Sequence, residues 1–330
     1  MKYPRHSIIV PVYNRPDEVK DLLESLTTQT RKDFEVIIVE DGSTIPCEDV
    51  VNKFSGKLPI RYYFKPNSGP GPSRNFGFVH AQGEYLVVFD SDCILPHTYF
   101  ETVDQALVID QLDAWGGPDR AHAEFTVAQR AMGYTMSSVL TTGGIRGGKK
   151  RVGWFQPRSF NMGISKKVFE VTGGFRFDRS AEDIEFSIRI KKAGFRTGLI
   201  PEAFVYHRRR STFFEFFKQV YNFGKGRAMI GTIHPEEVKL THWFPALFTI
   251  GTISLPLLYF TGGYLFTIGI SLFGLYLLLI FSHSLLMTRH PGVASLSVMS
   301  ALLQMWGYGL GFLTEKIKQK RGSVKTPSRN

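Results

Sequence analysis

The first two thirds of the chain alternate continuous apolar runs with segments whose apolar residues recur every three or four positions. Four apolar runs predict buried strands: SIIVPV (7–12), FEVIIVEDGS (34–43, ending in acids and Gly), PIRYYF (59–64) and YLVVFDSD (85–92). The segment between the first two runs predicts a helix from the spacing of Val19, Leu22, Leu23 and Leu26. Apolar strands that alternate with helices predict an α/β fold with a parallel sheet covered on both faces.

Later segments continue this alternation with less regular spacing. The predicted elements are a loop entering a helix (71–83), a loop rich in Gly and cations (141–159), a Ser-capped helix (165–175), a helix with acids in its first turn (181–194), a strand (198–207) and an aromatic, basic, amphipathic helix (212–229). The last of these either lies along a membrane surface or packs on the core.

Polar side chains stand at the ends of the predicted strands. Asp90 and Asp92 end the fourth strand, and Glu40 and Asp41 end the second. In parallel sheets ligands bind beyond the carboxyl ends of the strands, so we expect these acids to line a crevice. Paired carboxylates suit Mg²⁺ or Mn²⁺, and such an ion, shared with a diphosphate, assists its departure as a leaving group. Asp-x-Asp alone is more often a surface turn.

The C-terminal part is apolar over long stretches. Residues 240–288 contain no Asp, Glu, Lys or Arg, which predicts two membrane spans joined at residues 261–263, with Trp243 and Tyr264 near the interfaces. Residues 293–313 are apolar but include Gln304 and several Gly, and are expected to form a third span, a re-entrant helix or an interfacial helix.

Charge and cysteine content help to predict the cellular location of the protein. The formal net charge is +11, and residues 315–330 form a basic tail with six basic residues and one acid. Such a tail is expected on the cytosolic side of a membrane, or is a solvated end. The two cysteines, Cys47 and Cys93, show no metal-ligand spacing, and the N-terminus has too short an apolar run for a signal peptide. We therefore expect a multi-pass inner-membrane protein whose N-terminal soluble part faces the cytosol.

Five motifs occur together in order: SIIVPVYNRPDEVKDLLESLTTQT, FEVIIVEDGS, GPSRNFGFVHAQGEYLVVFDSD, NMGISKKVFEVTGGF and AEDIEFSIRI. In these motifs, over roughly residues 6–230, the chain resembles the family 2 glycosyltransferases. The resemblance implies the GT-A fold, an inverting reaction and a nucleotide-sugar donor, with a UDP-sugar expected. No G-x-G-x-x-G follows the first strand, which argues against a dinucleotide dehydrogenase.

The resemblance also assigns residues to roles. It places three residues at the nucleoside: Pro11, Tyr13 and Asn14. It gives Glu40 and Asp41 to the nucleobase side, with Glu40 standing where the family often has Asp, and Arg74 to the nucleotide. Asp90 then lies near the ribose and the metal, and Asp92 binds the metal.

The start of the helix at 181–194 supplies the remaining acids. Inversion needs one base across the pocket from the metal, and the resemblance makes Asp183 that base, with Glu182 as an acceptor-site or supporting acid. Without the resemblance, the simpler interpretation is that both acids stabilise the helix by interacting with the positive end of its dipole. His207, at a strand end before three arginines, is a candidate metal ligand, or else part of a basic juxtamembrane patch.

These inferences combine into one expectation. Residues 1–235 form the catalytic domain, 240–314 a membrane segment and 315–330 the basic tail. The predicted activity is transfer of one sugar to a hydroxyl of a lipid-linked saccharide or a cell-envelope polysaccharide precursor, because the Gln-x-x-Arg-Trp motif of processive synthases is absent from the sequence. Two alternatives remain: a polyprenyl-phosphate sugar synthase, and a membrane protein that binds nucleotide sugars without turnover.

Overall fold

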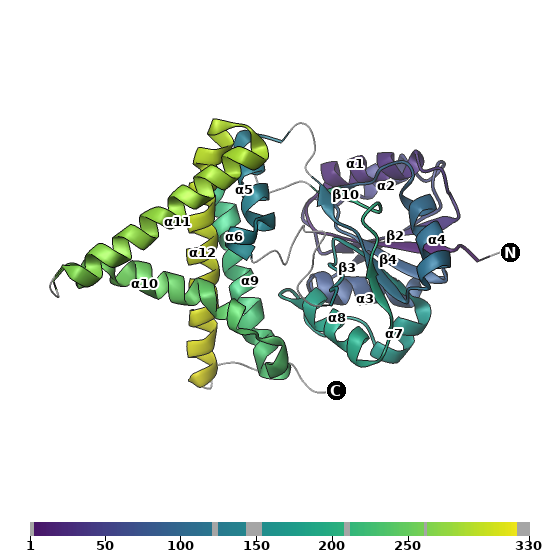
Figure 1. Cartoon of the computed structure of the whole chain (residues 1–330). Helices are drawn as coiled ribbons and strands as arrows, with labels where there is room; N and C mark the ends of the chain where they lie inside the picture. The colour runs from purple at the N-terminus through teal and green to yellow at the C-terminus, as the bar shows by residue number, and fades with distance from the viewer. Residues whose placement is uncertain (1–2, 121–124, 143–153, 208–211, 261–262, 322–330) are drawn as a thin grey trace. The chain divides into compact units, whose positions relative to one another are not determined.

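The computed structural model describes residues 3–120, 125–142, 154–207, 212–260 and 263–321 (Figure 1). The chain divides into two compact units. The first comprises Met1–His122 with Trp154–Arg208, and the second comprises Ala123–Gly153 with Arg209–Asn330.

A seven-stranded sheet forms the centre of the first unit, in the order β3-β2-β1-β4-β8-β6-β9. In chain order its strands are β1 (His6–Val12), β2 (Phe34–Asp41), β3 (Ile60–Lys65), β4 (Tyr85–Phe89), β6 (Ala114–Gly116), β8 (Asn161–Ser165) and β9 (Thr197–Leu199). The first four strands pair in parallel, and β8 runs antiparallel to both β4 and β6. The predicted α/β fold with a mostly parallel sheet is confirmed.

The strand predicted at residues 198–207 is in fact two short strands. β9 belongs to the large sheet, whereas β10 (Val205–His207) lies between β5 (Cys93–Ile94) and β7 (Asp119–Arg120) in a small three-stranded sheet. A turn containing Pro201 separates the two strands, and proline cannot donate a ladder hydrogen bond.

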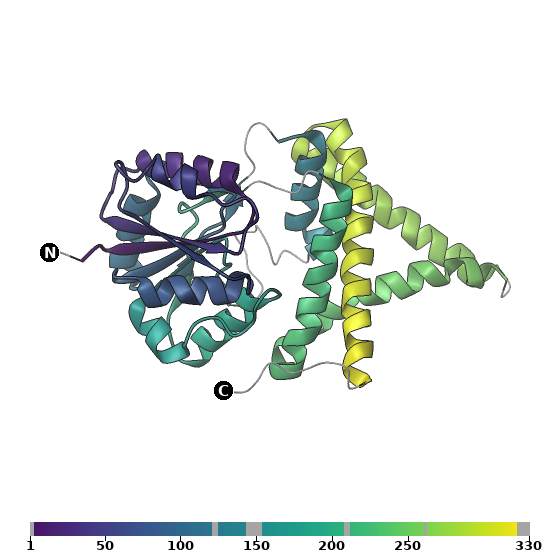
Figure 2. The same cartoon turned by 180° about the vertical axis from the view of Figure 1, so that it is seen from behind.

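Both faces of the large sheet are buried. Along β1, Ile8 and Val10 belong to one apolar cluster and Ile9 to the other, because successive side chains of a strand point to opposite faces. The first cluster is completed by helices α1 (Pro16–Thr27), α2 (Glu48–Asn52) and α4 (Tyr99–Asp110). The second is completed by α3 (Pro70–His80), α7 (Lys166–Thr172) and α8 (Glu182–Lys192). Figure 2 shows the same two layers of helices from behind.

The described part of the second unit is helical. Its α-helices are α5 (Val127–Ser137), α6 (Val139–Thr142), α9 (Phe213–Ile233), α10 (Phe244–Tyr259), α11 (Tyr264–Thr288) and α12 (Pro291–Lys320), with short 3₁₀ turns at Pro235–Glu237 and Leu240–Trp243. α12 contacts α5, α9, α10 and α11. Within this unit, α10 and α11 form a hairpin whose tip projects away from α12 (Figures 1 and 2).

Glycines bring α9 and α12 into backbone contact. A Cβ atom added at Gly224 would lie 2.0 Å from the Tyr308 carbonyl oxygen, and one at Gly311 would lie 2.0 Å from that of Tyr221. This close packing places α9 in the second unit, whereas the boundary predicted at residue 235 assigned it to the catalytic domain. The division into catalytic and membrane domains stays a prediction.

Two described helices, α11 and α12, are long and apolar enough to cross a membrane. The apolar run at 240–288 forms the expected pair of helices, but α10 has only 16 residues. The run at 293–313 lies within α12, which has 30 residues and continues into the first part of the predicted basic tail. The loop predicted at 141–159 lies largely outside the described residues.

Candidate active site at the carboxyl edge of the sheet

Two acids follow β4, and each is paired with an arginine. Arg74 donates from Nη2 to Asp90 Oδ1 at 2.9 Å, and Arg15 donates from Nη1 to Asp92 Oδ2 at 2.7 Å. The Asp92 side chain is only 8% exposed, so its carboxylate needs a compensating cation. Two charge pairs therefore lie at the end of β4. One is formed by Arg74 of α3, and the other by Arg15, the residue that precedes α1.

Arg74 joins two parts of the site. Its second amino group, Nη1, donates to Glu182 Oε1 at 2.9 Å, so one guanidinium links the end of β4 with the start of α8. The side chain is 3% exposed and lies over the Phe175 ring at 5.3 Å. Burial lowers the pKa of Arg74, but Asp90 and Glu182 outweigh burial and raise it, so the group stays charged. The predicted contact of Arg74 with the nucleotide stays a prediction.

The start of α8 presents the two acids predicted near the acceptor. α8 follows Ala181, whose φ of 58° turns the chain into the helix. Burial raises the pKa of Glu182, and the neighbouring Asp183 adds to this while Arg74 opposes it. Asp183 is the more exposed of the two side chains, and its Oδ2 lies 3.5 Å from Arg158 Nη1. A partly exposed carboxylate at this edge is suited to accept a proton from a bound hydroxyl.

Glu40 is fully buried and stabilises the loop that follows β2. It accepts hydrogen bonds from the Cys47 amide at 2.8 Å, from the Tyr62 hydroxyl at 3.3 Å and from Ser43. Two of these donors, Ser43 and Cys47, belong to the loop, and Tyr62 belongs to β3. A direct contact of Glu40 with the base stays a prediction.

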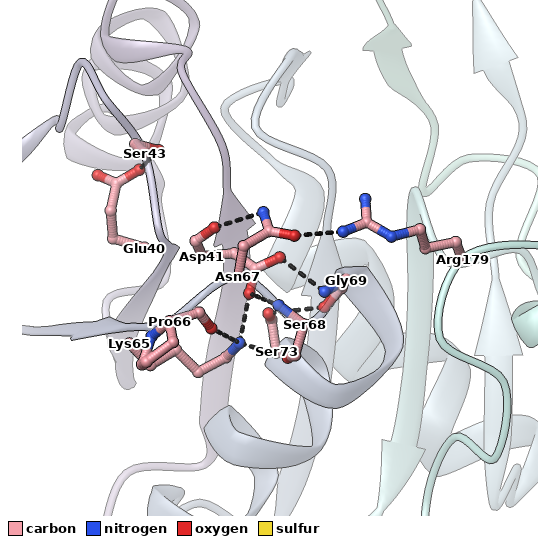
Figure 3. Close-up of polar contacts among 10 residues, drawn as sticks. All are labelled: Glu40, Asp41, Ser43, Lys65, Pro66, Asn67, Ser68, Gly69, Ser73 and Arg179. Atoms are coloured by element: carbon pink, nitrogen blue, oxygen red, sulfur yellow. Dashed lines mark hydrogen bonds and ion pairs between the residues drawn. The ribbon is translucent and has the colours of Figure 1, made fainter.

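Asp41 points toward the turn between β3 and α3 (Figure 3). Its carboxylate accepts from the Ser68 amide at 2.9 Å, from the Gly69 amide at 2.8 Å and from Lys65. Burial raises the pKa of Asp41, but these hydrogen bonds outweigh burial, so the pKa lies below its ordinary value. The next residue, Gly42, has a φ of 71°, and a Cβ atom there would lie 2.6 Å from the backbone nitrogen of Asn67.

The end of β1 is connected to the loop after β2 by Asn14. This residue has a φ of 55°, and its Oδ1 accepts from the amides of Thr44 at 2.8 Å and Ile45 at 2.9 Å. Tyr13 is exposed and Pro11 partly buried beside it. The structure thus brings these residues to the same edge as Asp41, where the nucleoside is predicted to bind.

β10 brings the backbone of His207 to the same region. His207 pairs with Cys93, the residue after Asp92. Its side chain and residues 208–210 lie outside the described part of the structure, so the metal role of His207 stays a prediction.

Sequence reasoning missed several cations of the site: Arg15, Lys65 and Arg158. Each contacts an acid that lies 24 or more positions away in the chain, so no local spacing reveals the pair. For Arg15, the one available signal was its position directly after the motif residue Asn14.

The donor chemistry of the site fits a hard divalent cation. Asp90 and Asp92 offer oxygen ligands, as Mg²⁺ and Mn²⁺ prefer. Among the described residues there is no group of three or more His, Cys, Asp or Glu arranged to hold a metal ion. Two carboxylates suit an ion that takes its other ligands from water and from substrate phosphates.

Comparison with known proteins identifies the family. The sequence profile described as "Glycosyl transferase family 2" matches residues 7–221, and that described as "Glycosyl transferase family group 2" matches residues 147–321. An uncharacterized glycosyltransferase of Rickettsia felis is 41% identical over 86 residues, which is 26% of this chain and 14% of the relative. An uncharacterized glycosyltransferase of Nostoc is 28% identical over 173 residues, covering 50% of this chain and 52% of the relative. The chain thus spans about half or less of the length of these two relatives.

Solved structures share the fold. The mannosyltransferase PcManGT from Pyrobaculum calidifontis, solved with GDP-Man and Mn²⁺, superposes with a TM-score of 0.64 at 16% identity, over 97% of this chain and 89% of that chain. TarS of S. aureus superposes with a TM-score of 0.50 at 21% identity, over 69% of this chain and 39% of that chain. The fold is therefore GT-A, and the chain belongs to glycosyl transferase family 2.

Proposed function

We propose that the chain transfers one sugar, with inversion, from a nucleoside-diphosphate sugar to a hydroxyl of a lipid-linked saccharide or a cell-envelope polysaccharide precursor. The observation that carries the proposal is the Arg74 bridge. One buried guanidinium lies 2.9 Å from Asp90 at the end of β4 and 2.9 Å from Glu182 at the start of α8. It links Asp90, one of the two proposed metal acids, to Glu182, the residue directly before the proposed base Asp183.

Each side of this edge has a different part in the reaction. Asp90 and Asp92 would hold a divalent cation, which neutralises charge on the departing diphosphate. Asp183 accepts the proton of the acceptor hydroxyl as that oxygen bonds to the anomeric carbon and the bond from carbon to phosphate oxygen breaks. Tyr13, Asn14 and Asp41 line the proposed nucleoside side. The Mn²⁺ and GDP-Man bound by the structural neighbour PcManGT support a cation and a nucleotide sugar here. A UDP-sugar is the first donor to test.

The helical unit supports a membrane-borne acceptor. Apolar side chains of the α10–α11 hairpin are exposed over most of its length, including Ile253, Leu257, Leu265 and Leu272. Backbone contact through Gly224 and Gly311 resembles the packing of small residues between membrane helices. Hydroxyl pairs also join the helices, such as Ser284 with Ser297 at 2.8 Å. We therefore propose that this unit anchors the enzyme in the inner membrane with the catalytic unit in the cytosol.

A donor screen tests the proposal. Membranes containing the full chain are mixed with a panel of UDP- and GDP-sugars, with and without bacterial lipid extract, and release of nucleoside diphosphate is measured. We expect release with one donor, dependent on both lipid extract and Mn²⁺, and lost in Asp92→Asn. Donor binding without release across the panel would instead favour a binding protein without turnover.

A further inference from the structure

Arg15 stands at the start of α1, directly after the nucleoside motif. As the residue before the helix it has φ −141° and ψ 52°, and its side chain makes no capping hydrogen bond. The side chain instead reaches Asp92, 77 positions away, with Nη1 2.7 Å from Oδ2. The local helix start therefore does not require an arginine here, and the contact that the side chain makes lies at the proposed metal acid.

Arg15 and Arg74, the two arginines at the carboxyl edge of the sheet, differ in their exposure and in the acids they contact. Arg74 is 3% exposed and bonded to two acids, so moving it would break a buried network. The Arg15 side chain is 32% exposed, whereas the Asp92 side chain with which it pairs is 8% exposed. The Arg15 guanidinium is therefore able to leave Asp92 when another cation compensates the charge of that buried carboxylate.

A cation and a guanidinium compete for one carboxylate. Asp92 is largely buried, and Arg15 supplies a positive charge beside it. A divalent cation held by Asp92 would compete with Arg15 Nη1, which lies 2.7 Å from Asp92 Oδ2. A diphosphate sharing that cation brings phosphate oxygens next to Asp92, and guanidinium groups bind phosphate with paired hydrogen bonds. Arg15 then has a new partner within reach of its present one.

We propose that Arg15 occupies the cation position at Asp92 in the donor-free enzyme and becomes a ligand of the donor diphosphate when cation and donor bind. This inference rests on the proposed function, because it takes the metal and the diphosphate to lie at Asp92. It predicts that Mn²⁺ binds weakly in the absence of nucleotide and tightly in its presence. The binding of the two ligands is then positively cooperative.

Calorimetric titration of the full chain in detergent tests this without measuring activity. In Arg15→Gln, Mn²⁺ without nucleotide should bind about fivefold more tightly than in the wild type, the size expected for one partly exposed charge pair. With saturating Mn²⁺, the same variant should bind UDP or GDP, whichever binds the wild type, about fivefold more weakly. Binding of the corresponding nucleoside should not change.

Arg5→Gln is the matched control. Arg5 Nε lies 2.8 Å from Asp104 and its side chain is 34% exposed, but it precedes β1 at the opposite edge of the sheet. This variant should leave both affinities unchanged.

Two results separate the inference from the function on which it rests. Unchanged or weaker Mn²⁺ binding by Arg15→Gln, or unchanged diphosphate binding, overturns the role of Arg15 while leaving the metal site in place. Wild-type Mn²⁺ affinity in Asp92→Asn shows that the metal lies elsewhere and overturns both.

Discussion

The acids at the carboxyl edge of the sheet differ in what surrounds them, although they look alike in the sequence. Glu40 is fully buried and bonded to its own loop, whereas Asp183 is partly exposed near Arg158. Asp92 is 8% exposed and Asp90 is 34% exposed, and each is paired with an arginine. Burial and hydrogen bonding thus separate acids that stabilise the fold from acids available for chemistry.

The role of Asp183 is tested by replacing its carboxylate with an amide. Asp183→Asn should lower sugar transfer by about a hundredfold or more, because a general base contributes at least that factor. Calorimetry should find donor binding unchanged, since the proposed nucleotide contacts lie on other elements. Asp178→Asn, which alters an exposed acid five residues upstream, should retain wild-type turnover. Full activity of Asp183→Asn would remove the base assignment and favour a lipid-phosphate acceptor, which needs no strong base.

Asp41 gives a prediction about stability and pH. Its folded-state pKa is lowered, so its ionised form stabilises the fold above the ordinary pKa of aspartate, and this contribution is lost as pH falls through the lowered value. Asp41→Asn should lower the free energy of unfolding by about 2 kcal/mol at pH 7. Chemical denaturation at several pH values should show the difference shrinking below about pH 4. A difference that is constant between pH 7 and pH 3 would contradict this account.

At the scale of elements, the strands were predictable and the long-range pairs were not. β1, β2 and β4 are continuous apolar runs, which is what burial on both faces of a parallel sheet requires. The bond from Arg74 to Glu182 spans 108 positions and that from Arg15 to Asp92 spans 77, so neither leaves a local pattern. The burial of Glu40 was not apparent from the sequence either, because it depends on its contacts with Cys47 and Tyr62, 7 and 22 positions away.

Helix packing in the second unit is tested by adding single methyl groups. Gly224→Ala places a Cβ against the Tyr308 carbonyl oxygen at 2.0 Å, which forces α9 and α12 apart and should cost about 2 kcal/mol. Thermal unfolding in detergent should show a lower midpoint. Gly274→Ala in α11 is the control, because nothing lies within 4 Å of its added Cβ. Equal midpoints for the two variants would contradict the close contact of α9 with α12.

At the scale of the whole chain, one family 2 catalytic fold is combined with a helical unit built from two separate parts of the sequence. α5 comes from the middle of the chain, yet it contacts α12 near the C-terminus. Thr135 of α5 pairs with Ser300 of α12 at 2.9 Å. The sequence did not reveal this insertion, because the spacing within α5 is that of any amphipathic helix. The chain therefore passes between the two units at more than one point.

The proposed anchor is tested by placing a charge on the hairpin. Leu272→Arg puts a cation on an exposed apolar position of α11, where its transfer into a bilayer costs about 3 kcal/mol. A larger fraction of the protein should then be released from membranes by alkaline carbonate. Val108→Arg, at an exposed apolar position of α4 in the first unit, should stay with the membrane like the wild type. Equal release of both variants would indicate that the hairpin does not enter the bilayer.

The central claim is that the acids following β4 hold the cation that the donor diphosphate shares. Crystals of the full chain grown with Mn²⁺ and a bound nucleoside diphosphate locate the ion by its anomalous scattering. The account predicts an Mn²⁺ peak at Asp92, with the diphosphate on the same ion. A diphosphate bound away from both Asp90 and Asp92 would contradict it.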